Sequence, residues 1–417
     1  MNPPAPPPAP PTPPAPPPSG PPPSGPTPPS GPAPRESGPG RRFALRPPSF
    51  TGRLHDARTA TAIGRWLGAA FAVCFVTGLI SHYLQHPPDW AADLLPGRPV
   101  WGYRLSQGLH IAAGLAAIVL LLAKLWTVYP RLFAWPPVRG VRHALERLSV
   151  AVLVASAVLE VFTGLLNIAE WYPWPFGFIQ THFALAWVVT GSLLLHLAVK
   201  APEIKAHWSP SSPGTLQLPS QDGPDRRSLL LGVGAAVGAV TLTTAGQSFT
   251  PLARLDLLAP RHPDHGPQGL PVNRTAAAAG ITERAVRDWR LEVRGPTPYT
   301  LTLDQLRALP RVQARLPIAC VEGWSVEARW SGVRIRDLMA RAGAPAGAGL
   351  RVTSMEAGGA YRVMEMGRDY AGDPLTLLAL ELNGQVLTAD HGYPARVIAP
   401  NRPGVLQTKW VTLLEVL

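Results

Sequence analysis

Cysteine is nearly absent from this chain of 417 residues, which contains only Cys74 and Cys320. Cys74 lies in a long apolar run and Cys320 in a polar C-terminal region, so a disulfide between them is not expected and a disulfide scaffold is excluded. A lone cysteine is most often a small buried hydrophobe. Here, an apolar, strand-like approach at 316–319 delivers Cys320 to a Glu-Gly-Trp turn. Such a turn could present a thiolate as a soft ligand for a transition metal.

Acidic residues are also few, because 26 Asp and Glu face 38 Lys and Arg, for a formal net charge of +12. This balance is typical of nucleic-acid-binding proteins or of membrane proteins with basic cytoplasmic loops. Five apolar segments that are long enough, or nearly so, to cross a bilayer favour the second class. We therefore expect contact with membrane lipid and no nucleic-acid partner.

Composition divides the chain into five parts. Residues 1–50 are rich in Pro, Ala, Ser and Gly and are expected to form a disordered tail with polyproline II character. Residues 51–205 are expected to form a four-span membrane domain, with spans at 63–82, 105–128, 148–169 and 179–200. A linker at 206–224, a weakly apolar fifth span within 225–248, and a C-terminal domain at 249–417 complete the chain.

The distribution of basic residues predicts the topology. Lys and Arg cluster before the first span, between the second and third, and after the fourth, whereas residues 170–181 contain none. By the positive-inside rule, this multi-pass protein of the cell membrane has a cytoplasmic amino terminus and an extracytoplasmic C-terminal domain. Arg226 and Arg227 precede the fifth span and resemble a twin-arginine export signal. Alternatively, they only mark its inner end.

Several short motifs of the C-terminal domain recur in the order known from one family. They are Cys320-Val-Glu-Gly-Trp324-Ser325, Trp330-Ser-Gly-Val333, Asn383-Gly384 and His391-Gly-Tyr-Pro-Ala-Arg396. Over about residues 270–417 the chain resembles the sulfite oxidase family of molybdopterin enzymes, and within it the protein-methionine-sulfoxide reductase group. The cysteine is not followed by the Gly-Asn-Arg pattern of animal and plant sulfite oxidases, which argues against sulfite as the substrate.

This resemblance implies a set of site residues. Cys320 would be the catalytic residue and the molybdenum ligand, and Asn273 would lie beside the metal. Arg396 and Lys409 match the family's pterin-binding motifs, since arginine and lysine are the usual means of holding a phosphate. His391 and Glu322 are further candidates for cofactor binding. For each basic residue taken alone, a solvated surface charge is the alternative.

Histidines in the expected spans predict a second cofactor. His182 and His196 are fourteen residues apart, almost four helical turns, so they face the same way. His110, on the second span, lies at a depth close to that of His182. Two imidazoles at equal depth on facing helices can hold a six-coordinate haem iron. This pattern resembles the b-type cytochrome subunits of membrane formate dehydrogenases and hydrogenases, which implies haem b between His110 and His182.

Other polar residues of the spans keep more than one interpretation. His196 has no obvious partner for a second haem, although Lys124 and His143 are candidates. His82 could bind haem iron or serve a quinone. Glu160 could carry protons for quinone chemistry. For any one of these residues, a hydrogen bond to a neighbouring span is the alternative.

The sequence therefore predicts a multidomain protein, an all-α membrane bundle followed by an α+β sulfite-oxidase-like molybdopterin domain. In that domain, strands are expected at 289–293, 350–355, 361–364 and 396–399, and a helix at 302–309 capped by Thr302.

The expected function is that of a molybdenum-cofactor oxidoreductase exchanging electrons between a quinone pool, haem b and the molybdenum site, without a further subunit. The expected reaction is reduction of an S- or N-oxide such as methionine sulfoxide. The alternatives are oxidation of a small, sulfite-like substrate that feeds electrons to the membrane, and a non-catalytic haem-binding membrane anchor.

Overall fold

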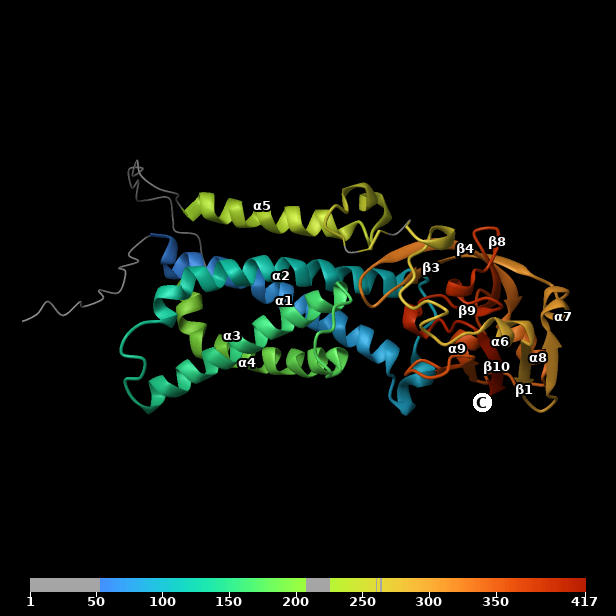
Figure 1. Ribbon diagram of the computed structural model, residues 1–417. Coiled ribbons are helices and arrows are strands. Elements are labelled where there is room, and N and C mark those ends of the chain that lie inside the picture. Colours follow the sequence, from blue (N-terminus) through green and yellow to red (C-terminus); the bar gives the residue numbers. More distant parts are fainter. Residues whose placement is uncertain (1–52, 208–225, 260, 263–264) are drawn as a thin grey trace, which may run out of the picture. The chain divides into compact units, whose positions relative to one another are not determined.

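The computed structural model describes residues 53–207, 226–259, 261–262 and 265–417. The expected Pro-rich tail and nearly all of the expected linker fall outside these residues. Within them, the chain forms long helices first and a mixed region of short helices and strands afterwards (Figure 1).

Five long helices form the first region: α1 (Ala57–Gln85), α2 (Gly102–Leu132), α3 (Val141–Ile168), α4 (Phe178–Ala206) and α5 (Arg226–Ala245). Among the described residues these five are the helices long and apolar enough to cross a membrane, judged by length and composition. Helices α1, α2 and α4 extend past their expected spans at both ends, and α3 does so at its start, because apolarity stops at the hydrocarbon boundary whereas the hydrogen-bonded helix need not. At the start of α1, Asp56 caps the helix by accepting a bond of 2.6 Å from the amide of Thr59.

The helices pack in pairs, α1 with α2 and α3 with α4, and α5 packs on α2. Their shared apolar contact consists of a few fully or nearly buried side chains: Ile63, Leu67, Ala117, Leu120, Leu121, Ala157 and Val189. Many other large apolar side chains of these helices are exposed, among them Trp66 at 70% and Leu194 at 62%. Exposed apolar surface of this extent is expected where lipid rather than water surrounds a helix.

Short helices connect the elements. The 3₁₀ helices are η1 (Arg53–His55), η2 (Asp89–Leu94), η3 (Thr250–Leu255), η4 (Pro267–Gly269), η5 (Ala389–His391) and η6 (Gly404–Leu406). The short α-helices are α6 (Glu283–Arg287), α7 (Leu303–Arg307), α8 (Ile335–Arg341) and α9 (Arg368–Ala371).

Two five-stranded sheets form the C-terminal region. The first has the order β2-β1-β10-β5-β6, made of β2 (Tyr299–Thr302), β1 (Arg290–Arg294), β10 (Val411–Val416), β5 (Leu350–Ser354) and β6 (Val363–Met366). The second has the order β3-β4-β7-β8, made of β3 (Val312–Ala319), β4 (Ser325–Arg334), β7 (Leu377–Leu382) and β8 (Gln385–Val386), with β9 (Arg396–Ile398) also paired to β7. In the first sheet β1 and β10 are parallel, and the other pairs are antiparallel.

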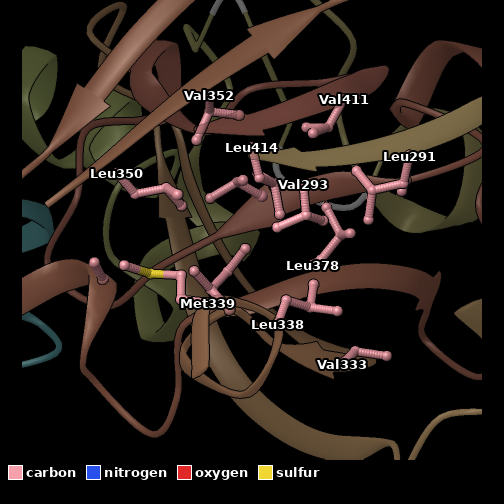
Figure 2. Packing of buried hydrophobic residues seen from close by; sticks show 14 of the residues in the cluster. Leu291, Val293, Val333, Leu338, Met339, Leu350, Val352, Leu378, Val411 and Leu414 are labelled. Carbon is pink, nitrogen blue, oxygen red and sulfur yellow. The ribbon is translucent and has the colours of Figure 1, made fainter. Parts of the chain in front are cut away.

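The main core draws side chains from both sheets and from α8. Figure 2 shows Leu291, Val293, Leu350, Val352 and Leu414 of the first sheet close to Val333 and Leu378 of the second, with Leu338 and Met339 of α8. Seven of these nine side chains are at most 1% exposed. Close packing of this kind makes the C-terminal region a folded unit with its own core.

The expected elements of this region recur with shifted ends. Strand β6 begins at Val363 rather than at 361 and continues to Met366. Helix α7 is capped by Thr302, whose hydroxyl accepts from the amide of Gln305 while the Gln305 side chain accepts from the amide of Thr302. Strands β2, β4, β7, β8 and β10 were not expected from the sequence.

Candidate functional site

Cys320 occupies the turn of the β3–β4 hairpin. The register places Ala319 opposite Ser325, so the chain must reverse within the five residues between them. The amide of Cys320 donates to the carbonyl of Trp324 at 2.9 Å, and the amide of Gly323 donates to the carbonyl of Cys320 at 3.1 Å. Gly323 has a φ of +105°, a conformation that favours glycine. The Glu-Gly-Trp sequence therefore forms the turn that it predicts.

The thiol of Cys320 is buried, and it is hydrogen-bonded to the side chain of Asn273 and to the backbone of Val321 and Glu322. The side-chain amide of Asn273 donates to Sγ at 2.9 Å, and the indole of Trp324 donates to Asn273 Oδ1 at 3.2 Å. Burial, followed by the nearby carboxyl of Glu322, raises the pKa of Cys320 well above its usual range. A thiol in this place ionises only if a cation offsets the burial, and a bound metal ion is such a cation. The donor set thus fits a metal-bound thiolate.

Glu322 lies two residues after Cys320 and is also buried. Burial raises its pKa to about 7, and the charge of Arg261 opposes that shift. Its Oε2 atom has no hydrogen-bond partner among the described residues. Unpaired polar atoms are costly inside a protein, so this oxygen fits a partner that the described chain does not supply.

Arg396 and Lys409 lie on either side of Gly392. A Cβ added to Gly392 would be 3.0 Å from the Cβ of Lys409 and 3.1 Å from that of Arg396. Arg396 donates through Nη1 to the carbonyl of His391 and through Nη2 to that of Gln407, both at 3.2 Å, and its buried Nε has no partner in the described chain. Burial lowers the pKa of Arg396 to about 10.

Lys409 and His391 are held by backbone carbonyls. Lys409 Nζ donates to Arg274 and Asp390 at 2.8 Å each, and burial, then the charge of Arg396, lowers its pKa to about 7. His391 Nε2 donates to the carbonyl of Pro267 at 2.6 Å, and burial lowers the pKa of this imidazole to about 4. A buried arginine with a free donor beside a half-buried lysine fits an anionic group such as a pterin phosphate.

The structure thus brings Asn273 to Cys320, and brings His391, Arg396 and Lys409 together. Sequence reasoning missed Trp324 as the residue that orients Asn273. It also missed Tyr361, whose pKa is raised by burial and then by the charge of Cys320. Trp324 stood inside the quoted motif and could have been found there. Tyr361 lies forty-one positions after Cys320, and no local pattern marks it.

The turn after Cys320 is also hydrogen-bonded to helical residues. The side-chain amide of Gln107 on α2 donates to the carbonyl of Val321 at 2.8 Å. The amide of Ser325 donates to the carbonyl of Gln247, just after α5, at 2.6 Å. Ser248 Oγ donates to the carbonyl of Gly323. Three of the five residues that follow the metal-ligand candidate are therefore hydrogen-bonded to residues remote in sequence.

His110 and His182 face each other in the helical region. Their ring centroids are 6.2 Å apart with an interplanar angle of 81°. Two imidazole nitrogens at bond lengths of about 2 Å from one metal ion place the ring centroids roughly 6 Å apart. His110 Nδ1 donates to the carbonyl of Cys74 at 3.0 Å, and His182 Nδ1 lies 3.0 Å from Thr163 Oγ1. These bonds orient both rings through Nδ1, so that Nε2 is the ring atom a metal would bind.

Glycines make room for these rings. A Cβ on Gly78 of α1 would lie 3.1 Å from His110 Cε1, and one on Gly164 of α3 would lie 3.3 Å from His182 Cε1. Both histidines line one large, mostly apolar cavity between α1, α2, α3 and α4. A planar apolar macrocycle between two imidazoles fits that lining. Glu160 Oε1 lies 3.3 Å from His182 Nε2, so this carboxyl must turn away when Nε2 binds a metal.

The remaining histidine candidates are separate from that pair. The ring of His82 stacks on Phe183, with centroids 3.7 Å apart. Among the residues that the structure describes, no second imidazole contacts the ring of His196. Lys124 Nζ instead donates to the carbonyl of Ala60 at 2.6 Å, and His143 Nδ1 accepts from the amide of Arg139 at 3.2 Å. Within the described chain, no group of three or more His, Cys, Asp or Glu side chains could hold a metal ion.

Comparison with known proteins finds a family match for the C-terminal third of the chain. Residues 278–417 match the family model described as oxidoreductase molybdopterin binding domain. An uncharacterized oxidoreductase of Bacillus subtilis is 32% identical over 126 residues, 30% of this chain and 62% of that protein. A putative protein-methionine-sulfoxide reductase subunit of Azospira oryzae is 34% identical over 138 residues, 33% of this chain and 52% of that protein. The mitochondrial sulfite oxidase of Drosophila melanogaster is 32% identical over 158 residues, 31% of this chain and 27% of that protein.

Residues 278–417 thus match a molybdopterin-binding oxidoreductase domain, and the chain is similar to proteins named as a sulfite oxidase and as a putative methionine-sulfoxide reductase subunit. The chain spans only 62%, 52% and 27% of the lengths of these three relatives. Cys320, Glu322, His391, Arg396 and Lys409 lie inside the matched range, and Asn273 lies just before it.

Proposed function

We propose that this protein is a membrane-bound molybdopterin oxidoreductase that reduces an S- or N-oxide, such as methionine sulfoxide, with electrons from a quinol. The observation that carries the proposal is the buried Cys320 thiol, held by Asn273 on a hairpin turn of a molybdopterin-binding domain. Methionine sulfoxide is the first substrate to test because the similar Azospira oryzae protein is named a putative protein-methionine-sulfoxide reductase subunit.

Each residue of the Cys320 site has a role in this proposal. The Cys320 thiolate would bind molybdenum, and Asn273, oriented by Trp324, would keep Sγ in place by its hydrogen bond of 2.9 Å. Arg396, Lys409 and His391 would hold the pterin, and Glu322 would contact the cofactor through its unpaired oxygen. When bound, the cofactor supplies oxygen-atom transfer, and the protein supplies ligation, orientation and exclusion of water.

The helical site has the second role. His110 and His182 would hold haem b through their Nε2 atoms, and the carbonyl of Cys74 and the hydroxyl of Thr163 keep both rings in that orientation. When bound, the haem supplies one-electron transfer between the quinone pool and the molybdenum site. His82 and His196 are the alternative candidates for haem ligands. The similarity to cytochrome subunits rests on the histidine pattern and on this geometry.

We propose that residues 51–205 and 225–248 lie in the membrane, with the amino terminus cytoplasmic and residues 249–417 outside. The five long apolar helices support membrane association. Arg226 and Arg227 stand at the beginning of α5, where a twin-arginine signal for export of a folded domain would lie.

Replacing Arg226 and Arg227 together by lysine tests this export route. The change keeps the charge, so a purely positive-inside role predicts no effect, whereas a signal role leaves the C-terminal domain inside while the first four spans still insert. Protease accessibility of the domain in spheroplasts measures the outcome. Equal accessibility in wild type and variant would show that the two arginines mark only the inner end of the span.

A second function has its own support. Similarity to mitochondrial sulfite oxidase favours oxidation of a small sulfur compound, with electrons flowing into the membrane. Molybdenum and haem quantification on the purified protein, followed by substrate screens with reduced and with oxidised dyes, decides among the functions. We expect both cofactors and activity with reduced dye and methionine sulfoxide. Activity with oxidised dye alone would reverse the direction, and haem without molybdenum would leave a non-catalytic membrane anchor.

A further inference from the structure

The C-terminal end of α1 carries three polar side chains. His82 and Gln85 are three residues apart on the last turn, a spacing that places side chains together on a helix, and His86 is the residue that caps the helix. All three line the large cavity between the helices, and so does Phe183 of α4. His110 and His182 line the same cavity, so this group shares the cavity of the proposed haem site.

The side-chain amide of Gln85 is held in one orientation by hydrogen bonds, and its Oε1 atom accepts no hydrogen bond from the described residues. Its Nε2 donates to the carbonyl of Ser81 at 3.2 Å and to Ser81 Oγ at 3.0 Å. A carbonyl accepts only, so the amide nitrogen must face it, and Oε1 takes the opposite place. Oε1 is buried and has no hydrogen-bond partner among the described residues. Ser81 is in turn held by the side chains of Tyr103 and Gln107, at 3.2 and 3.1 Å.

The two imidazoles add further hydrogen-bonding capacity and an aromatic surface. The ring of His82 lies flat against Phe183, with centroids 3.7 Å apart and an interplanar angle of 9°. The ring of His86 lies 5.3 Å from that of His82. Within the described chain, neither imidazole side chain has a hydrogen-bond partner. Each imidazole can therefore donate a hydrogen bond to a ligand or accept one from it.

These features define the chemistry of the ligand. It must donate a hydrogen bond to Gln85, bond to an imidazole, carry a flat aromatic ring, and be apolar enough to enter a cavity between membrane helices. We propose that His82, Gln85, His86 and Phe183 form the binding site for the head group of a quinol. A hydroquinone has two hydroxyl donors on an aromatic ring and a lipid-soluble tail. An ionised carboxylate, such as a haem propionate, cannot donate to Gln85 Oε1.

This site rests on the proposed function for its physiological ligand, but its test is a binding measurement. The probe is the fluorescent quinol analogue 2-heptyl-4-hydroxyquinoline N-oxide, titrated into the detergent-purified full-length holoprotein. Saturable quenching is expected in the wild type. Gln85→Leu removes the acceptor and Phe183→Leu removes the aromatic face, and each is expected to weaken binding about tenfold, the effect of losing one specific contact.

Tyr83→Phe is the matched control, because Tyr83 is on the same turn but is exposed and outside the cavity lining. It should bind the analogue like wild type, and all variants should keep their haem spectrum, which shows that the bundle is intact. Two results would overturn the site: unchanged affinity in both test variants, or loss of haem from Gln85→Leu, which would assign Gln85 to the haem.

The same titration separates this site from the proposed function. Analogue binding by a protein whose haem a reduced quinol does not reduce would retain the site and refute the quinol as electron donor. A wild type that reduces methionine sulfoxide with reduced dye but binds no analogue would overturn the site and leave the proposed reaction in place.

Discussion

The hairpin turn of Cys320 and the helix pair of His110 and His182 position their side chains by different means. Cys320 follows a strand, and its hydrogen-bond partner Asn273 lies 47 residues earlier in the chain. Each histidine instead lies on a helix, and its Nδ1 partner belongs to a neighbouring helix, Cys74 of α1 or Thr163 of α3. A turn positions a side chain by the conformation of its own backbone. A side chain on a helix is instead positioned by hydrogen bonds from the neighbouring helix.

Packing differs in the same way. The core of the C-terminal region contains many side chains that are 0% exposed, including Leu291, Val293 and Leu350. The helical region buries few large side chains, and its close approaches use glycine, as at Gly78 and Gly164. Water drives apolar burial in the first case, whereas between helices in lipid the fit of small residues matters more. The position of Cys320 therefore depends mainly on the residues next to it in sequence. The positions of His110 and His182 depend on how their helices pack together.

The largest expected effect is at the turn. Cys320→Ser should abolish turnover with methionine sulfoxide and reduced dye, since a serine hydroxyl does not replace a thiolate as a soft ligand. The haem spectrum should be unchanged, because the histidine pair makes no contact with Sγ. Turnover and absorbance are measured on the same preparation. Undiminished turnover would refute Cys320 as the metal ligand.

Replacing His110 or His182 by Ala should remove the haem and leave turnover at the molybdenum site intact, the reverse of the Cys320→Ser result. Each change should remove the low-spin haem absorbance, while dye-linked turnover at the molybdenum site stays near that of wild type. His143→Ala is the matched control, because His143 caps only a local amide of Arg139. If both variants keep full haem and His82→Ala or His196→Ala loses it, the ligands are wrongly assigned.

These two regions also differ in how far their sequence predicts them. The Cys320 turn, the Thr302 cap and the five apolar helices follow from local patterns that the structure repeats. The positions of His110 and His182 within their expected spans also predicted a similar depth, and their rings are in fact neighbours. Local periodicity and turn chemistry suffice for such features.

Long-range pairings could not be predicted. Strand β10 pairs in parallel with β1, although more than a hundred residues separate them, and no local pattern specifies that register. The contact between Glu160 and His182 depends on how α3 and α4 rotate against each other. The anchoring of Asn273 by Trp324 depends on a loop that returns to the hairpin.

A smaller effect concerns His391, whose pKa of about 4 in the folded state lies below the ordinary value of 6.5. As pH falls from about 6.5 toward 4, the unfolded chain takes up a proton that the folded domain excludes, so stability is lost over that window, by roughly 2 kcal/mol. His391→Gln keeps an amide donor for the carbonyl of Pro267 and does not titrate. Its unfolding temperature should fall less on acidification, as measured by thermal scans at both pH values. Parallel decreases in wild type and variant would exclude His391 as the source.

The smallest expected effect is a change in the stability of the C-terminal region alone, without a change in the stability of the helical region. Thr302→Ala removes the hydroxyl that caps α7 and should lower the stability of the domain by about 1 kcal/mol. Thr302→Ser is the matched control, because it keeps the capping oxygen and should differ from wild type by only a few tenths of that. Limited proteolysis of the C-terminal domain during a thermal scan measures the domain, and haem absorbance in the same scan measures the helical region. Since the cap touches no helix of that region, the alanine variant should lower the first transition alone. A matching decrease in the haem transition would show that the two regions unfold together.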